Sequence, residues 1–161
     1  MYTVLTGQKK KIGDFIITDR ARALLAHVRP EHELFQLPHW EPIDPHLEKV
    51  NQSHAVIIMG GPGYQPGFYP KVYKLLEDPD RIKPPVIPMG LGWKGASGSP
   101  EDVDSYHFTK RSLNMLHRIQ ERTRYLGCRD HQSVNVLRNH GITSALMTGC
   151  PVWYHIDSLG K

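Results

Sequence analysis

The sequence lacks most of the features that mark specialised classes of protein. It has two cysteines, Cys128 and Cys150, which are too few and too far apart for a disulfide framework or a zinc site. No apolar run approaches the ~20 residues that a membrane-spanning helix needs, and the longest, residues 55–59, has the length of a strand. The N-terminus lacks the basic and apolar regions of a signal peptide. We therefore expect a cytoplasmic protein with two reduced, buried thiols.

Charge and motif spacing exclude further kinds of site. The formal net charge is +4, but the basic residues are spread along the chain and their one tight run is residues 9–11, so no nucleic-acid partner is expected. The ten histidines show no metal-ligand spacing, and we predict no metal site and no cofactor. The first glycine loop, from Gly7 to Asp14, fits neither the Walker A nor the Rossmann dinucleotide pattern. Because the Asp14 carboxylate would repel a phosphate, this loop is not expected to be a phosphate cradle.

What the sequence does contain is an alternation of short apolar runs and helical patterns. The expected strands are 2–6, 33–37, 55–59, 85–90, 124–128 and 142–148, and the expected helices are 14–28, 44–52, 70–77, 101–122 and 130–140. This alternation predicts an α/β fold, with a doubly wound parallel sheet in a single domain over residues 1–161. Ligands bind such sheets at the carboxyl ends of the strands. The loops expected there are 7–14, 60–69, 90–99, 129–133 and 148–154.

Asp14 is the first candidate for the site. It follows Gly13 at the predicted start of a helix, where a carboxylate is favoured as an N-cap. The cap is the commoner role for such a residue, and the alternative is that Asp14 accepts a hydrogen bond from a substrate hydroxyl; both roles can hold together. We expect Asp44, before Pro45, to cap the next helix in the same way.

Two glycine-rich loops follow predicted strands. In residues 60–70, Gly60 and Gly61 allow close approach of the backbone, and Tyr64 could present a flat face to a sugar ring or simply cover the sheet. In residues 90–99, the Gly90-Leu91-Gly92 sequence before Trp93 could bind an anion through backbone amides or form a flexible turn.

Arg129 and Asp130 follow the predicted strand 124–128. Asp130 is placed to cap the next helix, which Gly141 should end. Arg129 could bind a carboxylate or phosphate with two parallel hydrogen bonds, or pair with a nearby acid. The sequence leaves both roles open.

The order of these motifs resembles the N-terminal half of the polysaccharide pyruvyl transferase family. The family pattern has a Gly-Asp after the first strand, a Gly-Gly turn, a Gly-x-Gly, and an Arg-Asp-x-x-Ser that opens a helix ending in Gly. The same features occur here, in the same order, as Gly13-Asp14, Gly60-Gly61, Gly90-Leu91-Gly92 and Arg129-Asp130 with Ser133.

The resemblance implies a Rossmann-like lobe of a two-lobed, GT-B-like transferase. Such an enzyme moves the pyruvyl group of phosphoenolpyruvate, its donor substrate, onto two hexose hydroxyls as a cyclic ketal in cell-surface polysaccharide biosynthesis. The implied partners are phosphoenolpyruvate and a carbohydrate or lipid-linked glycan acceptor, with a location that could include the inner face of the membrane. We assign Asp14 and Arg129 as catalytic candidates. The substrate-binding candidates are Gly13, Gly60, Gly61, Tyr64, Gly90, Gly92, Trp93 and Asp130.

The sequence departs from the family pattern in two respects. Members are about twice as long and carry the donor-binding Arg and catalytic His in the second lobe, so this chain is expected to be one lobe, inactive alone. Members usually have an acidic residue before the proline after the last strand, where this chain has Cys150-Pro151. Two alternatives remain: a lobe of a glycosyltransferase that uses a nucleotide sugar, and a sugar-binding module without catalysis.

Overall fold

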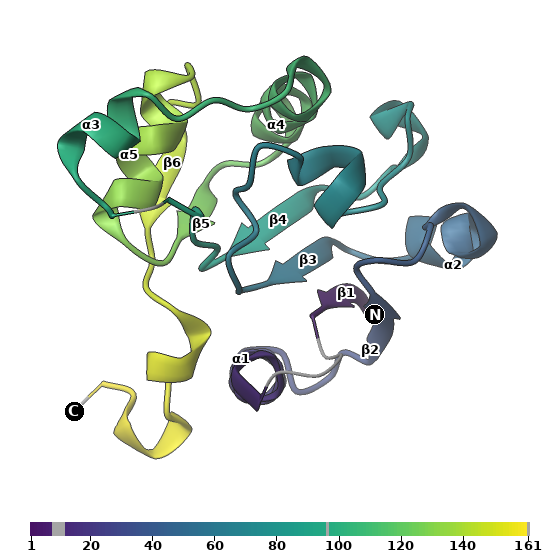
Figure 1. Ribbon diagram of the computed structural model, residues 1–161. Coiled ribbons are helices and arrows are strands. Elements are labelled where there is room, and N and C mark those ends of the chain that lie inside the picture. Colours follow the sequence, from purple (N-terminus) through teal and green to yellow (C-terminus); the bar gives the residue numbers. More distant parts are fainter. Residues whose placement is uncertain (8–11, 96, 161) are drawn as a thin grey trace.

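A parallel sheet forms the centre of the computed structural model, which describes residues 1–7, 12–95 and 97–160 (Figure 1). Four strands pair in the order β2-β1-β3-β4, and every pairing is parallel. Their bounds are Tyr2–Thr6 for β1, Leu34–Pro38 for β2, Val56–Met59 for β3 and Val86–Met89 for β4. The predicted parallel α/β fold is therefore confirmed.

A second parallel pair continues the sheet beyond β4. It consists of β5 (Leu126–Cys128) and β6 (Ala145–Met147). Leu91, just after β4, forms a parallel bridge with Cys128 and donates a hydrogen bond to the carbonyl of Gly127 over 3.0 Å. The carboxyl ends of β3, β4 and β5 consequently lie along one rim.

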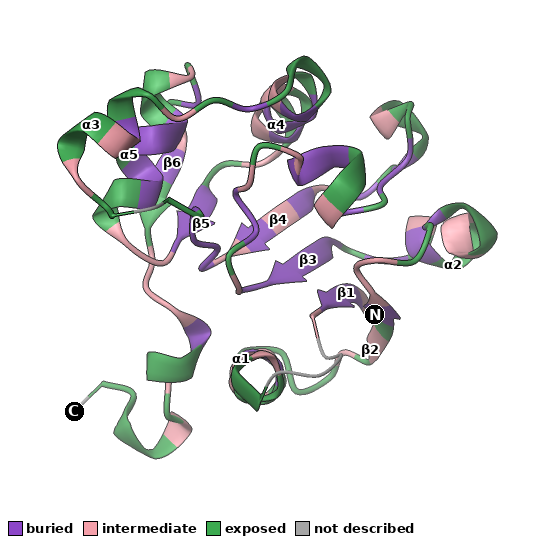
Figure 2. Cartoon of the chain, viewed as in Figure 1, coloured by how far each residue is buried: buried purple, intermediate pink, exposed green. Residues whose placement is uncertain are grey.

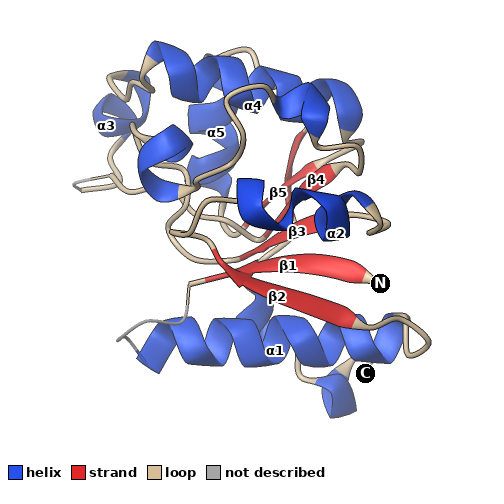
Figure 3. Ribbon diagram, turned by 90° about the vertical axis from the view of Figure 1, so that its right-hand side faces the viewer, coloured by secondary structure: helices blue, strands red, loops and turns tan. Residues whose placement is uncertain are grey.

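Helices cover both faces of the sheet (Figure 3). Helix α1 (Ile12–Val28) covers the face of β1 and β2 that lies opposite the other helices. The remaining helices are α2 (Leu47–Asn51), α3 (Pro100–Asp104), α4 (Lys110–Arg122) and α5 (His131–Asn139). Short turns η1 to η5 span Asp44–His46, Phe68–Val72, Pro79–Arg81, Pro151–Trp153 and Ile156–Ser158. No helix within the described ranges is long and apolar enough to cross a membrane.

The alternation of side chains along β3 explains why this strand is apolar throughout. Ile58 packs in the large core on the side of α4 and α5, whereas Ile57 and Met59 pack in a smaller core beneath α1. Because both faces of β3 are covered, every residue of the strand is buried (Figure 2).

The helix predicted over residues 101–122 is two helices. Ser99 caps α3 by accepting a hydrogen bond from the Asp102 amide, and Thr109 caps α4 by accepting one from the Ser112 amide. Between the helices, Phe108 is buried in the core and Tyr106 packs against it. The helix is interrupted here because Thr109 caps α4 and because the rings of Tyr106 and Phe108 pack into the core.

The helix predicted over residues 70–77 is also wrong. Only a short π-helical turn, η2, forms at its start, and Tyr73 already has extended backbone angles. The backbone of Lys74 bonds to the loop after β2 instead, donating to His39 and accepting from Ile43. This tertiary pairing replaces the local helical bonds and brings Tyr73 next to the end of β2.

The predicted helix caps differ in outcome. Asp130 caps α5, since its Oδ1 accepts a hydrogen bond from the Ser133 amide at 2.7 Å, and Gly141 follows this helix with a positive φ of 78°. Asp14 lies within the first turn of α1, which begins at Ile12, so it is not the N-cap. Asp44 does not cap either, because it is the first residue of η1 and no side chain caps that turn.

The two thiols are free, as predicted, but only one is buried. Burial raises the pKa of the Cys128 thiol to about 12, and its sulfur lies 3.6 Å from the Leu126 carbonyl oxygen. Cys150 is partly exposed.

Replacing the cap of α4 tests how strongly the break between α3 and α4 contributes to stability. Thr109→Ala removes the oxygen that accepts from the Ser112 amide, at 3.2 Å, and should lower the free energy of unfolding. We expect a loss of about 1 kcal/mol in urea titrations followed by circular dichroism. Thr143→Ala, at an exposed turn position, is the matched control and should change stability by less than about 0.5 kcal/mol. Equal effects of the two substitutions would contradict the capping role.

Candidate active site

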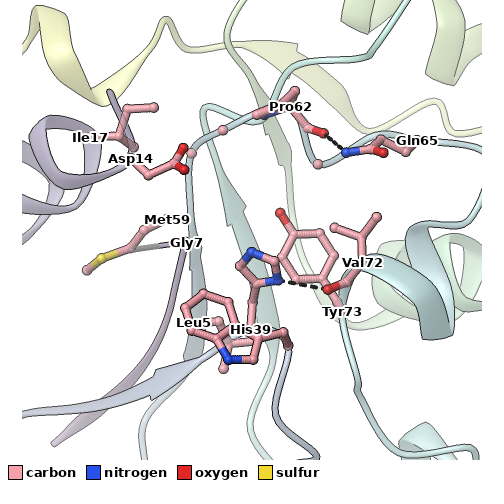
Figure 4. Close-up of a pocket in the computed structure, with 14 residues that line it drawn as sticks. Leu5, Gly7, Asp14, Ile17, His39, Met59, Pro62, Gln65, Val72 and Tyr73 are labelled. Atoms are coloured by element: carbon pink, nitrogen blue, oxygen red, sulfur yellow. Dashed lines mark hydrogen bonds between the residues drawn. The ribbon is translucent and has the colours of Figure 1, made fainter. Parts of the chain in front are cut away.

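A pocket opens at the carboxyl ends of β1, β2 and β3, at the point where the strand order reverses (Figure 4). Its volume is about 490 Å³, which suits a small organic ligand. Open parallel sheets bind ligands at such a reversal. The residues that line it are Leu5, Gly7, Asp14, Ile17, His39, Trp40, Met59, Gly60, Gly61, Pro62, Gly63, Gln65, Val72 and Tyr73.

Asp14 supplies the carboxylate of the pocket. The first turn of α1 places its side chain toward the cavity, next to Gly7 at the end of β1 (Figure 4). No described residue forms an ion pair with this carboxylate. Among the described residues, its oxygens are therefore available to accept hydrogen bonds from a ligand, and the acceptor role stays a prediction.

His39 is the second polar group, and sequence reasoning missed it. Its ring lies in the middle of the pocket, with Nδ1 2.8 Å from the carbonyl oxygen of Val72 (Figure 4). A carbonyl oxygen can only accept, so Nδ1 carries the hydrogen. This fixes the tautomer of the neutral imidazole and leaves Nε2 as an acceptor.

Tyr73 supplies a hydrogen-bond donor, and it was also missed. Burial raises the pKa of its phenol, and the negative charge of Asp14 raises it further, so the hydroxyl stays protonated. No described residue accepts its hydrogen bond. The hydroxyl fits because its neighbour Gly63 has no side chain; a Cβ there would overlap it and would lie 2.6 Å from Leu91 Cδ2.

The backbone connects this pocket to Arg129. The Gly92 amide donates to the Gly61 carbonyl at 2.8 Å, and the Arg129 amide donates to the Leu91 carbonyl at 2.9 Å. The four residues that the sequence placed on one rim, Asp14, Gly61, Gly92 and Arg129, thus follow one another along the carboxyl ends of the strands.

Arg129 lies over Gly92, where a Cβ would collide with its guanidinium group. Its Nε donates to Asp130 Oδ2 at 3.1 Å, which realises the acid-pairing alternative. The side chain is 36% exposed, and none of the described residues bonds to its two terminal nitrogens. These nitrogens can still bind an anion. Asp130 is engaged by both the cap and this pair, which gives it a structural role.

The other candidates from the sequence lie in different places. Gly60 and Gly61 line the pocket, whereas Gly13 is an exposed residue of α1 and Gly90 packs against Gly149. Tyr64 is fully buried, with its hydroxyl 3.4 Å from the Gly127 carbonyl, and Trp93 is 7% exposed in the same core. The ring of Tyr64, one of whose two expected roles was to face a sugar, is therefore part of the core, and so is Trp93.

Two further expectations concern the first glycine loop and metal binding. The lysine run of residues 9–11, within the first glycine loop, lies outside the described residues. Within the described part of the chain, no group of three or more His, Cys, Asp or Glu side chains could hold a metal ion.

Fold and pocket together define an α/β protein with a pocket at the carboxyl ends of a parallel sheet. The chain belongs to the polysaccharide pyruvyl transferase family, since the family model described as "Polysaccharide pyruvyl transferase" matches residues 12–160. The match covers most of the chain and confirms the resemblance seen in the sequence. A search of curated proteins gave no match, and neither did a search of solved structures.

The close fit between Gly63 and Tyr73 can be tested by a double-mutant cycle. Tyr73→Phe should change the free energy of unfolding by less than about 0.5 kcal/mol, because the lost hydroxyl has no described partner. Gly63→Ala should cost roughly 1–3 kcal/mol through overlap with that hydroxyl and with Leu91. In the Tyr73→Phe background the cost of Gly63→Ala should fall by about 1 kcal/mol.

Gly13→Ala is the control for this cycle. A Cβ there meets nothing within 4 Å, so the substitution should be neutral or gain up to about 1 kcal/mol from helix propensity. Additive effects in the cycle would show that the Tyr73 hydroxyl does not occupy the space next to Gly63.

Proposed function

We propose that the protein transfers the pyruvyl group of phosphoenolpyruvate to two hydroxyls of a hexose in a polysaccharide or lipid-linked glycan. The product is a cyclic ketal, and inorganic phosphate is released. Membership of the transferase family supports the class of reaction. The observation that carries the proposal is the pocket at the β1/β3 reversal, which contains Asp14 and whose wall at Gly61 is connected to Arg129 through the backbone bonds of Leu91 and Gly92.

The pocket has the chemistry that a sugar acceptor requires. A sugar hydroxyl both donates and accepts hydrogen bonds, and the pocket offers acceptors at Asp14 and His39 and a donor at Tyr73. On this proposal, Asp14 accepts the proton of one acceptor hydroxyl as that oxygen attacks the substituted enol carbon of phosphoenolpyruvate.

The donor is an anion with a carboxylate and a phosphate, and it needs positive charge. Arg129 suits such a group, because none of the described residues bonds to its two terminal guanidinium nitrogens. Asp14 would repel the donor, so we assign the acceptor to the pocket and the donor to the Arg129 side of Gly61 and Gly92. A second, GT-B-like lobe facing this rim, with its own Arg and His, completes the proposed enzyme.

Release of phosphate from phosphoenolpyruvate by the full-length protein, with a panel of hexose-containing glycans, tests the proposal. Asp14→Asn should lower turnover by about 10²-fold or more, because amide nitrogen and oxygen cannot accept the hydroxyl proton. Its free energy of unfolding should fall by no more than about 1 kcal/mol, the usual value of a carboxylate in the first turn of a helix.

Asp19→Asn is the matched control on the same helix, where Asp19 is exposed and away from the pocket. It should leave turnover unchanged. Absence of phosphate release with every acceptor would refute the proposed reaction, and binding of the glycans without release would favour the sugar-binding module.

A further inference from the structure

Both backbone groups of His39, its amide and its carbonyl, form hydrogen bonds to other segments of the chain. Its amide donates to the Thr6 carbonyl at 3.0 Å, at the end of β1, and its carbonyl accepts from the Lys74 amide at 3.2 Å. Both partners belong to segments that line or adjoin the pocket. Tertiary hydrogen bonds therefore fix the position of the residue, although it lies in a loop.

The imidazole ring is oriented as firmly as the backbone. The bond from Nδ1 to Val72 sets its direction, and the rings of Trp40 and Tyr73 each lie with centroids 5.2 Å from it. If His39 contributed only to packing, the direction in which Nε2 points would have no effect. Here the ring is oriented so that Nδ1 bonds to Val72, whereas Nε2 has no hydrogen-bond partner among the described residues.

The remaining nitrogen, Nε2, faces the same space as Asp14. A Cβ built on Gly7 would lie 3.7 Å from His39 Nε2 and 3.8 Å from the Asp14 Cβ, so the two side chains flank this glycine (Figure 4). No described residue bonds to Nε2. The pocket thus presents two proton acceptors side by side.

The proposed reaction removes two protons from its acceptor. The two hydroxyl oxygens of the diol each form a bond to the central carbon of phosphoenolpyruvate, and the bond from that carbon to the phosphate oxygen breaks. One hydroxyl proton is balanced by the proton that the CH₂ carbon gains to become CH₃, and the other leaves with phosphate. No oxidant or reductant takes part. A single carboxylate serves one hydroxyl at a time, so the second needs another acceptor.

We propose that His39 is a catalytic residue that accepts the proton of one of the two acceptor hydroxyls, while Asp14 accepts that of the other. The inference rests on the proposed function and assigns the acceptor diol to the space between these two side chains. Tyr73, as a donor, binds a hydroxyl or ring oxygen of the same sugar.

His39→Asn is the sharpest test, because an asparagine amide can keep the hydrogen bond to the Val72 carbonyl but cannot accept the proton. At saturating substrates, phosphate release should fall by about 10²- to 10⁴-fold, with a much smaller change in acceptor KM. The midpoint of thermal unfolding should stay within ~2 °C of the unmodified protein. The variant His39→Ala opens space for imidazole, and added imidazole should raise the activity of this variant by at least about tenfold.

His46→Asn is the control: His46 ends η1 and contacts the edge of Phe35, outside the pocket. It should retain full turnover. Full turnover in His39→Asn would overturn the inference, as would a loss of activity that follows a loss of folded protein and that imidazole does not restore.

A second measurement separates this inference from the proposed reaction. In protein labelled with ¹⁵N-histidine, a methyl hexopyranoside should shift the His39 Nε2 resonance and leave that of His46 unchanged. A shift without phosphate release from phosphoenolpyruvate would refute the reaction but keep His39 as a hydroxyl acceptor. A His39 resonance that no hexopyranoside moves would overturn its role, whatever the activity.

Discussion

The backbone of Leu91 and Gly92 holds the carboxyl ends of three strands in line, and the candidate site depends on it. The Leu91 amide donates to the carbonyl of Gly127 in β5, and Gly92 both donates to Gly61 and accepts from the Tyr64 amide at 2.9 Å. Together with the bond from the Arg129 amide to the Leu91 carbonyl, the bond from Leu91 to Gly127 connects β5 to the end of β4 through the backbone. The bonds of Gly92 hold the turn that forms one wall of the pocket. A single two-residue segment therefore sets both the shape of the pocket and the place of Arg129.

The strands could be predicted because they are continuous apolar runs. The bounds of the helices could not, because they depend on tertiary contacts. The β3 run is buried on both faces, so the sequence alone reveals it as a central strand. The break at residues 105–109 arises because Phe108 is buried and Thr109 forms a cap. In the sequence, both residues also fit the pattern of a continuous amphipathic helix. The stretch after η2 bonds to the loop after β2, a partner far away in the chain.

The same contrast explains which site residues could be predicted. Asp14, Gly60 and Gly61 follow strands that the sequence shows clearly, and the rule that ligands bind at carboxyl ends places them at the rim, where they line the pocket. His39 follows β2 and satisfies that rule equally, so the signal was present in the sequence. Tyr73 gave no such signal, because it reaches the pocket only through the pairing of Lys74 with His39. Tyr64 was misjudged because a tyrosine in a glycine loop has no local feature that tells an exposed ring from a buried one.

The distribution of charge along the rim separates two kinds of ligand. The pocket contains a carboxylate, a histidine fixed by its hydrogen bond to Val72, and a phenol kept neutral by burial and by that carboxylate. Such a set suits neutral hydroxyls and disfavours an anion. Arg129 lies over Gly92 and does not line the pocket; it is partly neutralised by Asp130, but its terminal nitrogens are unpaired among the described residues. Under the proposed function, this difference in charge would direct a neutral acceptor to the pocket and an anionic donor to Arg129 before any reaction begins.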